Sequence, residues 1–169
     1  MFAKLRYCID FDMLKIVYHA LVSSHLQYCN LSWGNADKSI LEPLQTLQDR
    51  IIRIMTFTPY SCDNVKHLYD DIELLDLTQI HKLCKAKFMF KHKNEILPSN
   101  FDEYFKTGGR GLRSTDNSVY KHVWGRTTKS LKRLQFDGVK VWNSIPKSIR
   151  ELNSIGNFSQ IYKIHLLNG

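Results

Sequence analysis

Apolar side chains recur every three or four residues along most of the first 105 positions, which is the period of an amphipathic α-helix. The pattern predicts a first helix from Asp12 to about Tyr28, followed by the turn residues Trp33-Gly34-Asn35. A second helix is expected from Ser39 to about Met55. Because only a short turn separates the two helices, we expect them to pack antiparallel.

The side chains of this second helix predict its start and its buried face. Ser39 and Glu42 have the spacing of a capping box, which leaves Pro43 in the first turn or as the first helical residue. The apolar seam is expected to consist of Ile40, Leu44, Leu47, Ile51 and Ile54. The polar residues expected off this seam are Gln45, Gln48, Asp49, Arg50 and Arg53.

The helical pattern continues to the middle of the chain and then stops. After a break that contains Pro59, we expect a short helix over residues 65–72 and a longer one from Leu77, which Pro98 ends. The composition changes abruptly at 107–111, where Thr-Gly-Gly-Arg-Gly is typical of a flexible loop. The sequence therefore predicts two domains, a helical bundle over residues 1–105 and a basic subdomain over residues 106–169.

The second domain mixes strand-like and helical patterns. Residues 119–124 are rich in β-branched and aromatic side chains, and residues 131–136 partly alternate between apolar and polar positions, as in a small hairpin; Asp137-Gly138 is typical of a turn. A last amphipathic helix is expected to begin near Ser154 or Asn157. The predicted fold class is mainly α, an antiparallel helical bundle followed by a small basic α/β subdomain. The expected core anchors of this subdomain are Trp142 and Phe158.

Composition is that of a folded protein. Hydrophobic residues make up 43% and charged residues 24% of the 169 residues, close to the globular average. No stretch reaches the roughly 18 to 20 apolar residues that a membrane span needs, and residues 1–10 lack the apolar core of a signal peptide. We therefore expect a soluble protein of the cytoplasm or nucleus.

The four cysteines show neither a C-x-x-C pair nor a regular spacing, which favours a reducing compartment over a disulfide framework. His25 with Cys29, and His81 with Cys84, have helical spacing that could place two metal ligands on one face. Because no second matched pair completes such a site, Cys29 and Cys84 are expected to be small core residues. No metal and no other cofactor is predicted.

Charge is distributed unevenly along the chain. The net charge is +8, but residues 1–78 hold 7 Lys and Arg against 10 Asp and Glu (net −3), whereas residues 79–169 hold 17 against 6 (net +11). A concentrated positive region is typical of proteins that bind a polyanion, and a solvated basic face is the alternative. Among polyanions, the charge favours nucleic acid over a membrane surface.

The cations concentrate in residues 106–140, where nine Lys and Arg face only Asp116 and Asp137. Tyr120 and Trp124 lie among them, and aromatic rings beside cations let a single strand stack its bases while Lys and Arg hold its phosphates. The alternative is that these two rings are core anchors, as expected for Trp142. The composition of this segment thus predicts that it binds RNA or single-stranded DNA. Its cations are Lys106, Arg110, Arg113, Lys121, Arg126, Lys129, Lys132, Arg133 and Lys140.

Several short motifs follow one another over nearly the whole chain. The first helix and turn contain Leu21-Val22-Ser23-Ser24-His25-Leu26-Gln27-Tyr28-Cys29-Asn30-Leu31-Ser32-Trp33-Gly34. The motifs that follow are Leu47-Gln48, Arg53-Ile54, Ile96-Leu97-Pro98, Gly138-Val139-Lys140-Val141-Trp142-Asn143-Ser144-Ile145-Pro146, Ile149-Arg150 and Phe158. In this order they resemble the thumb and carboxy-terminal region of jockey-like non-LTR retrotransposon reverse transcriptases.

The resemblance implies a non-catalytic part of an RNA-directed DNA polymerase. In that family, the aromatic-x-Asp-Asp hairpin that holds the catalytic metal ions lies upstream, in a palm domain that would be a partner of this segment. Tyr69-Asp70-Asp71 lacks the intervening residue and is expected to be a solvated helix face or turn. The resemblance also makes Arg50 and Arg53 candidate contacts to the backbone of a primer–template duplex, with a local ion pair to Asp49 as the alternative.

No recognised nucleophile motif or phosphate-binding loop occurs in the sequence. We therefore expect no enzyme activity of the segment by itself. Two other functions stay open: a helical protein-interaction domain that works through the acidic first half, and a translated remnant of the element without function. Salt-sensitive binding of RNA would distinguish a nucleic-acid-binding segment from both of these alternatives.

Overall fold

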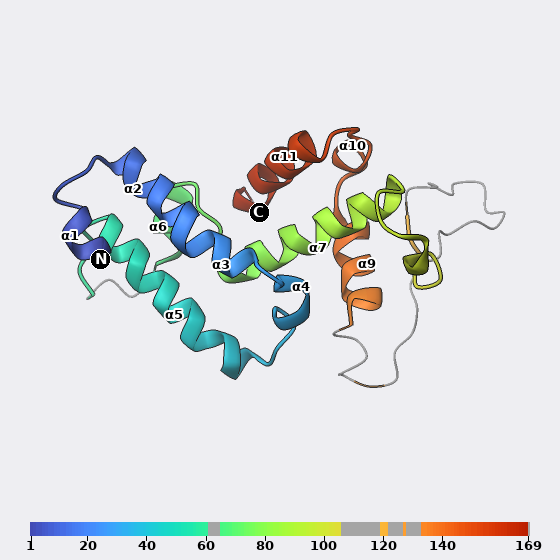
Figure 1. Cartoon of the computed structure of the whole chain (residues 1–169), viewed down its shortest axis with the longest axis horizontal. Coiled ribbons are helices and arrows are strands. Elements are labelled where there is room, and N and C mark those ends of the chain that lie inside the picture. Colours follow the sequence, from blue (N-terminus) through green and yellow to red (C-terminus); the bar gives the residue numbers. More distant parts are fainter. Residues whose placement is uncertain (61–64, 106–118, 122–126, 128–132, 169) are drawn as a thin grey trace. The chain divides into compact units, whose positions relative to one another are not determined.

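A computed structural model describes residues 1–60, 65–105, 119–121, 127 and 133–168 (Figure 1). Within these residues the regular elements are helices, and no strand is present. The chain forms two compact units, Met1–His81 and Lys82–Asn168. The prediction of a mainly helical protein is therefore confirmed. The predicted boundary loop at 107–111 lies outside the described residues, so the 105/106 boundary stays a prediction.

The first unit begins with a series of short helices. They are α1 (Phe2–Leu5), α2 (Phe11–Tyr18), the π-helical turn η1 (His19–Ser23), α3 (Ser24–Gln27) and α4 (Asn30–Trp33). Asp10 caps α2, because its side chain accepts a hydrogen bond of 3.1 Å from the backbone of Met13. The helix predicted over 12–28 is thus confirmed.

The π-helical turn changes which residues of this helix are buried. A π turn contains one residue more than an α turn, so the buried positions pass from Tyr18 to Ser23, an interval of five, and then to Leu26. Leu21, which a regular α-helical period would put on the apolar face, is exposed instead.

The long helix α5 (Lys38–Met55) packs antiparallel to the preceding helices, as predicted (Figure 1). Tyr18 and Gln48 are joined by a hydrogen bond of 2.8 Å, and the Arg6 guanidinium donates to the Ile54 carbonyl at 3.2 Å. Residues nearer the N-terminus of the chain therefore contact residues nearer the C-terminal end of α5, as antiparallel packing requires. The predicted end of α5 at Met55 is confirmed.

Two predictions for α5 are wrong. The helix begins at Lys38 with Asp37 as its N-cap, so Pro43 lies inside the helix rather than in its first turn. The seam is also rotated, because Ile40 and Leu47 are exposed. The residues that α5 buries most are Gln48, Ile52, Arg53 and Met55.

The buried amide of Gln48 explains the rotation. Its Nε2 atom donates to the Tyr18 hydroxyl at 2.8 Å and to the Leu75 carbonyl at 2.9 Å. These bonds satisfy the N–H donors of the amide, which burial would otherwise penalise, whereas its buried Oε1 atom has no hydrogen-bond partner among the described residues. The helices α6 (Lys66–Asp71) and the start of α7 (Leu77–Lys93) complete the unit. Its core contains Phe2, Leu14, Tyr18, Ile52, Met55, Leu68, Tyr69, Ile72 and Leu74.

The described part of the second unit contains the rest of α7 and four further helical elements. They are η2 (Ser99–Phe101), α9 (Leu134–Ser144), α10 (Lys147–Arg150) and α11 (Ile155–Leu167), whose N-cap is Ser154 as predicted. Trp142 and Phe158 are fully buried, and the Phe158 ring stacks on Phe90 with centroids 4.6 Å apart. Their predicted role as core anchors is therefore confirmed.

The predicted α/β subdomain is wrong for the described residues. Leu134 to Phe136 and the expected turn Asp137-Gly138 all lie in α9, and residues 119–121 form no strand. Gly138 packs closely, since a β-carbon there would come within 2.9 Å of Leu134 Cδ1. Among the described helices, none has the length and apolar character to cross a membrane.

Candidate functional site

The charge asymmetry of the sequence coincides with the two compact units. Residues 79–81 carry no Lys, Arg, Asp or Glu, so the unit Met1–His81 has the 7 cations and 10 anions counted over residues 1–78. The unit that begins at Lys82 has 17 cations against 6 anions. The positive charge of the protein is thus a property of one folded unit, which is what a polyanion-binding surface requires.

Several cations of this second unit point into solvent without compensation. Five of them are exposed and have no ion-pair or hydrogen-bond partner among the residues that the structure describes. By contrast, Lys147 pairs with Glu151 at 3.5 Å. The five uncompensated cations are Lys82, Lys91, Lys121, Arg133 and Lys140.

A buried ion pair removes one of the few anions from this surface. The Lys85 ammonium on α7 pairs with the Asp137 carboxylate on α9. Burial lowers the pKa of Lys85, and the hydrogen bond and charge of Asp137 oppose that shift. Arg133 and Lys140 lie four residues before and three residues after Asp137, adjacent to it on the helix surface. Because Lys85 neutralises Asp137, this carboxylate does not offset the two exposed cations.

Tyr120 is held in the core of the second unit. Its side chain is only 3% exposed, and its hydroxyl lies 2.7 Å from His92 Nδ1. The Asn143 side chain pairs with both backbone groups of Tyr120, at 3.1 Å to the N–H and 2.9 Å to the carbonyl. Burial raises the pKa of Tyr120. Of the two interpretations of this ring, the structure supports the core anchor rather than a free stacking face.

Most other predicted contacts of the basic segment fall outside the described residues. Lys121 and Arg133 are exposed, with Arg133 at the N-cap of α9. The residues outside the described ranges are Lys106, Arg110, Arg113, Trp124, Arg126, Lys129 and Lys132.

Arg50 and Arg53 have different environments although they lie one turn apart on α5. Arg50 is exposed, whereas Arg53 is 8% exposed and donates from Nη1 to the Pro59 carbonyl at 2.9 Å. Arg53 therefore holds the chain after α5. Asp49, the alternative ion-pair partner, accepts hydrogen bonds from Gln45 and Tyr69 instead. Only Arg50 is placed to contact a large ligand.

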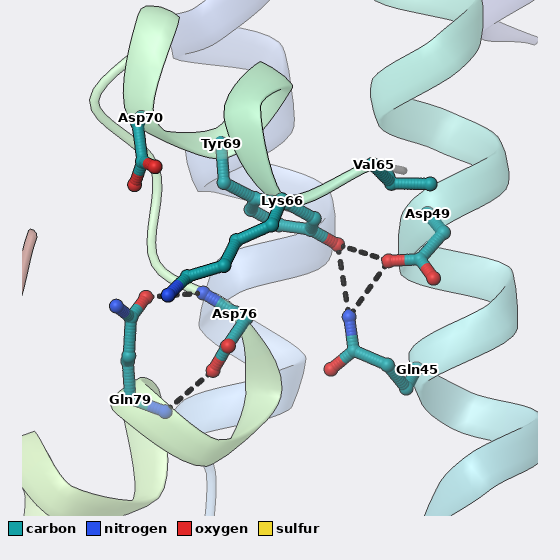
Figure 2. Close-up of a pocket in the computed structure, with 8 residues that line it drawn as sticks. All are labelled: Gln45, Asp49, Val65, Lys66, Tyr69, Asp70, Asp76 and Gln79. Carbon is teal, nitrogen blue, oxygen red and sulfur yellow. Dashed lines mark hydrogen bonds between the residues drawn. The ribbon is translucent and has the colours of Figure 1, made fainter. Parts of the chain in front are cut away.

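A polar pocket lies between α5, α6 and the start of α7 in the first unit (Figure 2). It has a volume of about 320 Å³. The Tyr69 hydroxyl donates to Asp49 Oδ1 at 2.7 Å, and Gln45 Nε2 donates to the same oxygen at 2.7 Å. Asp76 and Gln79 bond reciprocally at the start of α7, as in a capping box. The lining residues are Gln45, Asp49, Val65, Lys66, Tyr69, Asp70, Asp76 and Gln79.

This pocket organises the first unit rather than presenting reactive groups. Burial and the Asp49 carboxylate raise the pKa of Tyr69, so its phenol stays protonated. Gln45 Oε1 accepts from the Leu77 backbone at 3.0 Å, which ties α5 to α7. Sequence reasoning missed the pairing of Gln45 with Tyr69, since no local pattern links residues 24 positions apart. The spacing of Asp76 and Gln79 was a readable signal.

The candidate metal-binding residues do not assemble into a ligand set in the described part of the chain. Asp70 and Asp71 are exposed on the helix α6, as expected of a solvated helix face. Cys29 is exposed at a positive φ of 48°, so its predicted core position is wrong. His81 contacts Asn30 and Asn35 rather than a ligand pair with Cys84. In the part of the chain that the structure describes, no group of three His, Cys, Asp or Glu could hold a metal ion.

Comparison of the chain with models of protein families, with curated proteins and with solved structures finds no match.

Proposed function

We propose that this chain is a non-catalytic, nucleic-acid-binding segment of an RNA-directed DNA polymerase of the non-LTR retrotransposon type. It would correspond to the thumb and the region downstream of it, and a palm domain would be its partner in the parent polymerase. The second unit would bind RNA or single-stranded DNA through its basic surface. The family part of the proposal rests on the ordered motifs of the sequence.

The main support for nucleic-acid binding is that the basic half of the sequence coincides with one compact unit. The unit from Lys82 onward has 17 Lys and Arg against 6 Asp and Glu, and the other unit has an acidic excess. Exposed cations on α7 and α9 have no partner in the described residues, so they can exchange counterions for phosphates. Such contacts bind the backbone without reading its sequence.

The two aromatic residues of the basic segment have separate roles in this proposal. Trp124 stacks on bases, whereas Tyr120 fixes the chain beside it through His92 and Asn143. In the first unit, Arg50 remains the candidate contact to the backbone of a primer–template duplex. Arg53 supports this helix end from within, through its bond to Pro59.

Titration of a fluorescein-labelled single-stranded oligonucleotide, followed by anisotropy, tests the proposal. We expect a dissociation constant in the range of about 10⁻⁴ to 10⁻⁶ M at physiological salt, as for non-specific binders. Trp124→Ala should weaken binding by about 1 to 3 kcal/mol without changing its salt dependence, because stacking releases no counterions. No binding at low salt, together with a discrete protein partner retained at high salt, would favour the protein-interaction domain instead.

The absence of catalysis is tested separately. We expect the purified chain to incorporate no nucleotides on a primed template in the presence of Mg²⁺. Incorporation that survives repurification would contradict the proposal. Replacement of Asp70 and Asp71 by Asn would then show whether these exposed carboxylates of α6 carry it.

A further inference from the structure

The C-terminal end of α5 displays an aromatic side chain in a backbone conformation that aromatic residues rarely adopt. Phe57 has a φ of 56°, in the left-handed region. It follows the C-cap Thr56, and the Thr58 N–H bonds back to the Arg53 carbonyl at 3.0 Å, as in a Schellman motif. This position is normally glycine, because a side chain with a β-carbon is strained there.

Burial of the ring does not compensate for this strain. The Phe57 side chain is 56% exposed, and Tyr7, which meets it edge to face at 5.6 Å, is 70% exposed. A phenylalanine selected for core packing would be buried. Core packing therefore does not explain why a phenylalanine occupies this position.

Arg6 organises the two rings. Its guanidinium lies over both, 4.4 Å from the Phe57 centroid and 4.7 Å from the Tyr7 centroid. It also donates to the Ile54 carbonyl at 3.2 Å, and so caps the last turn of α5. A second pair stands at the same helix end, where the Arg53 guanidinium lies 5.9 Å from the exposed Tyr60 ring. Exposed aromatic rings thus lie beside two arginine side chains at one end of α5.

The charges at this end suit an anionic ligand, although the unit as a whole is acidic. Lys4 and Arg50 are exposed on α1 and on the last turns of α5. Of the nearby acidic residues, Asp10 accepts a hydrogen bond from the Met13 backbone at the start of α2, and Asp49 accepts one from the Tyr69 hydroxyl. Within the described residues, the surface around Phe57 therefore combines exposed aromatic faces with cations.

We propose that Arg6, Tyr7 and Phe57 form a base-stacking site for single-stranded nucleic acid. Planar rings and a guanidinium stack on any base, while Lys4 and Arg50 hold the flanking phosphates. The site lies in the first unit, apart in sequence from the basic segment. The choice of nucleic acid as its ligand rests on the proposed function. Sequence patterns missed it because positive φ at a phenylalanine has no local signal.

One substitution separates stacking from packing. Phe57→Gly removes the ring and also places a residue that adopts positive φ freely. We expect the melting temperature of the full-length protein to stay equal or rise, while affinity for a labelled oligouridylate of about 12 nucleotides falls about tenfold. Tyr28→Ala is the matched control, since Tyr28 is 76% exposed on the same unit. It should leave affinity unchanged.

Ultraviolet crosslinking of the same oligouridylate to the wild-type protein supplies a second readout. We expect peptides that contain Tyr7 or Phe57 to carry the crosslinked base. A Phe57→Gly protein that melts earlier and binds as tightly as wild type would overturn the inference, because the ring would then only pack. If wild type binds but neither peptide crosslinks, the site is excluded and the proposed function stands. If wild type does not bind, the proposed function itself fails.

Discussion

The imidazole of His81 lies directly on the backbone of Gly34, so that a β-carbon at residue 34 would overlap with Nδ1 and Cε1 of the ring. Asn30 and Asn35 hold the ring there, with side-chain oxygens 2.5 Å from Nδ1 and 2.8 Å from Nε2. The Asn30 amide in turn donates to the Leu26 carbonyl at 2.8 Å, which fixes its orientation. The Trp33-Gly34 turn of the sequence motif therefore forms the surface against which the first turns of α7 pack.

Gly34→Ala should lower the free energy of unfolding by about 1 to 3 kcal/mol, because the added methyl group displaces the His81 ring from its two partners. Chemical denaturation measures this change. Gly156→Ala is the control, since a β-carbon there meets only Ser154 Oγ, at 3.7 Å. That variant should be neutral or more stable by up to about 1 kcal/mol. Equal losses in both variants would contradict the close contact.

The Lys85 and Asp137 pair should respond asymmetrically to substitution. Asp137→Ala leaves a buried ammonium group without its partner and should cost about 3 kcal/mol of unfolding free energy. Lys85→Met removes the buried charge itself and leaves Asp137, which is partly exposed, to water. Its cost should stay below about 1 kcal/mol. Urea denaturation of both variants measures these changes. A larger loss of unfolding free energy for Lys85→Met than for Asp137→Ala would show that the Lys85 ammonium is not buried.

Buried phenols should make the protein less stable at alkaline pH. Burial raises the pKa of Tyr162 from 10.0 to about 12. Above pH 10 the folded state therefore retains a proton that the unfolded state loses, so stability falls as pH rises toward 12. The loss is about 1.4 kcal/mol per pH unit for this group. Tyr162→Phe should reduce the measured slope by that amount over this window, and an unchanged slope would contradict the burial of this phenol.

Thiol reactivity should follow the exposure of the described cysteines. Cys8 and Cys29 are exposed, whereas Cys84 is half-buried on α7, and burial raises the pKa of its thiol. Iodoacetamide at neutral pH should therefore alkylate Cys8 and Cys29 first, because the thiolate is the reactive form. Timed quenching and peptide mass mapping give the order. Early modification of Cys84 in the native protein would be inconsistent with its position.

Periodicity predicted the helices well because each is long enough to repeat its apolar pattern. The helices around Leu14, Ile52 and Ile80 all lie within a few residues of their expected bounds. The rotation of α5 could not be predicted in this way. The buried Gln48 amide donates to Tyr18 and Leu75, and both lie about 30 residues away.

The strand expected to end at Phe136 and the turn expected at Asp137-Gly138 are helical for a similar reason. Asp137-Gly138 has the composition of a turn, but Asp137 pairs with Lys85, 52 residues earlier, and Gly138 allows close packing against Leu134 and Met89. Non-local contacts thus overrode local turn propensity. The strand-like side chains of Leu134 to Phe136 pack equally well on a helix.

The sequence predicted the charge of the candidate site but not the positions of its side chains. Counting Lys and Arg located the basic half, whose start coincides with a folded unit. The burial of Tyr120 depends on Asn143 and His92, which no spacing rule connects to it. Phe57 was equally hidden, because glycine rather than phenylalanine normally marks a left-handed helix end.

The salt dependence of oligonucleotide affinity tests the central claim most directly. If about 4 cations of the basic unit contact phosphates, log affinity should fall against log salt with a slope near −3, since each neutralised phosphate of a single strand releases ~0.7 counterion. Lys132→Ala with Arg133→Ala should flatten that slope by about 1 to 1.5. Lys15→Ala with Lys38→Ala, which removes equal charge from the first unit, should leave it unchanged. Undetectable binding at low salt, or equal slopes for both double variants, would contradict a nucleic-acid-binding function of the second unit.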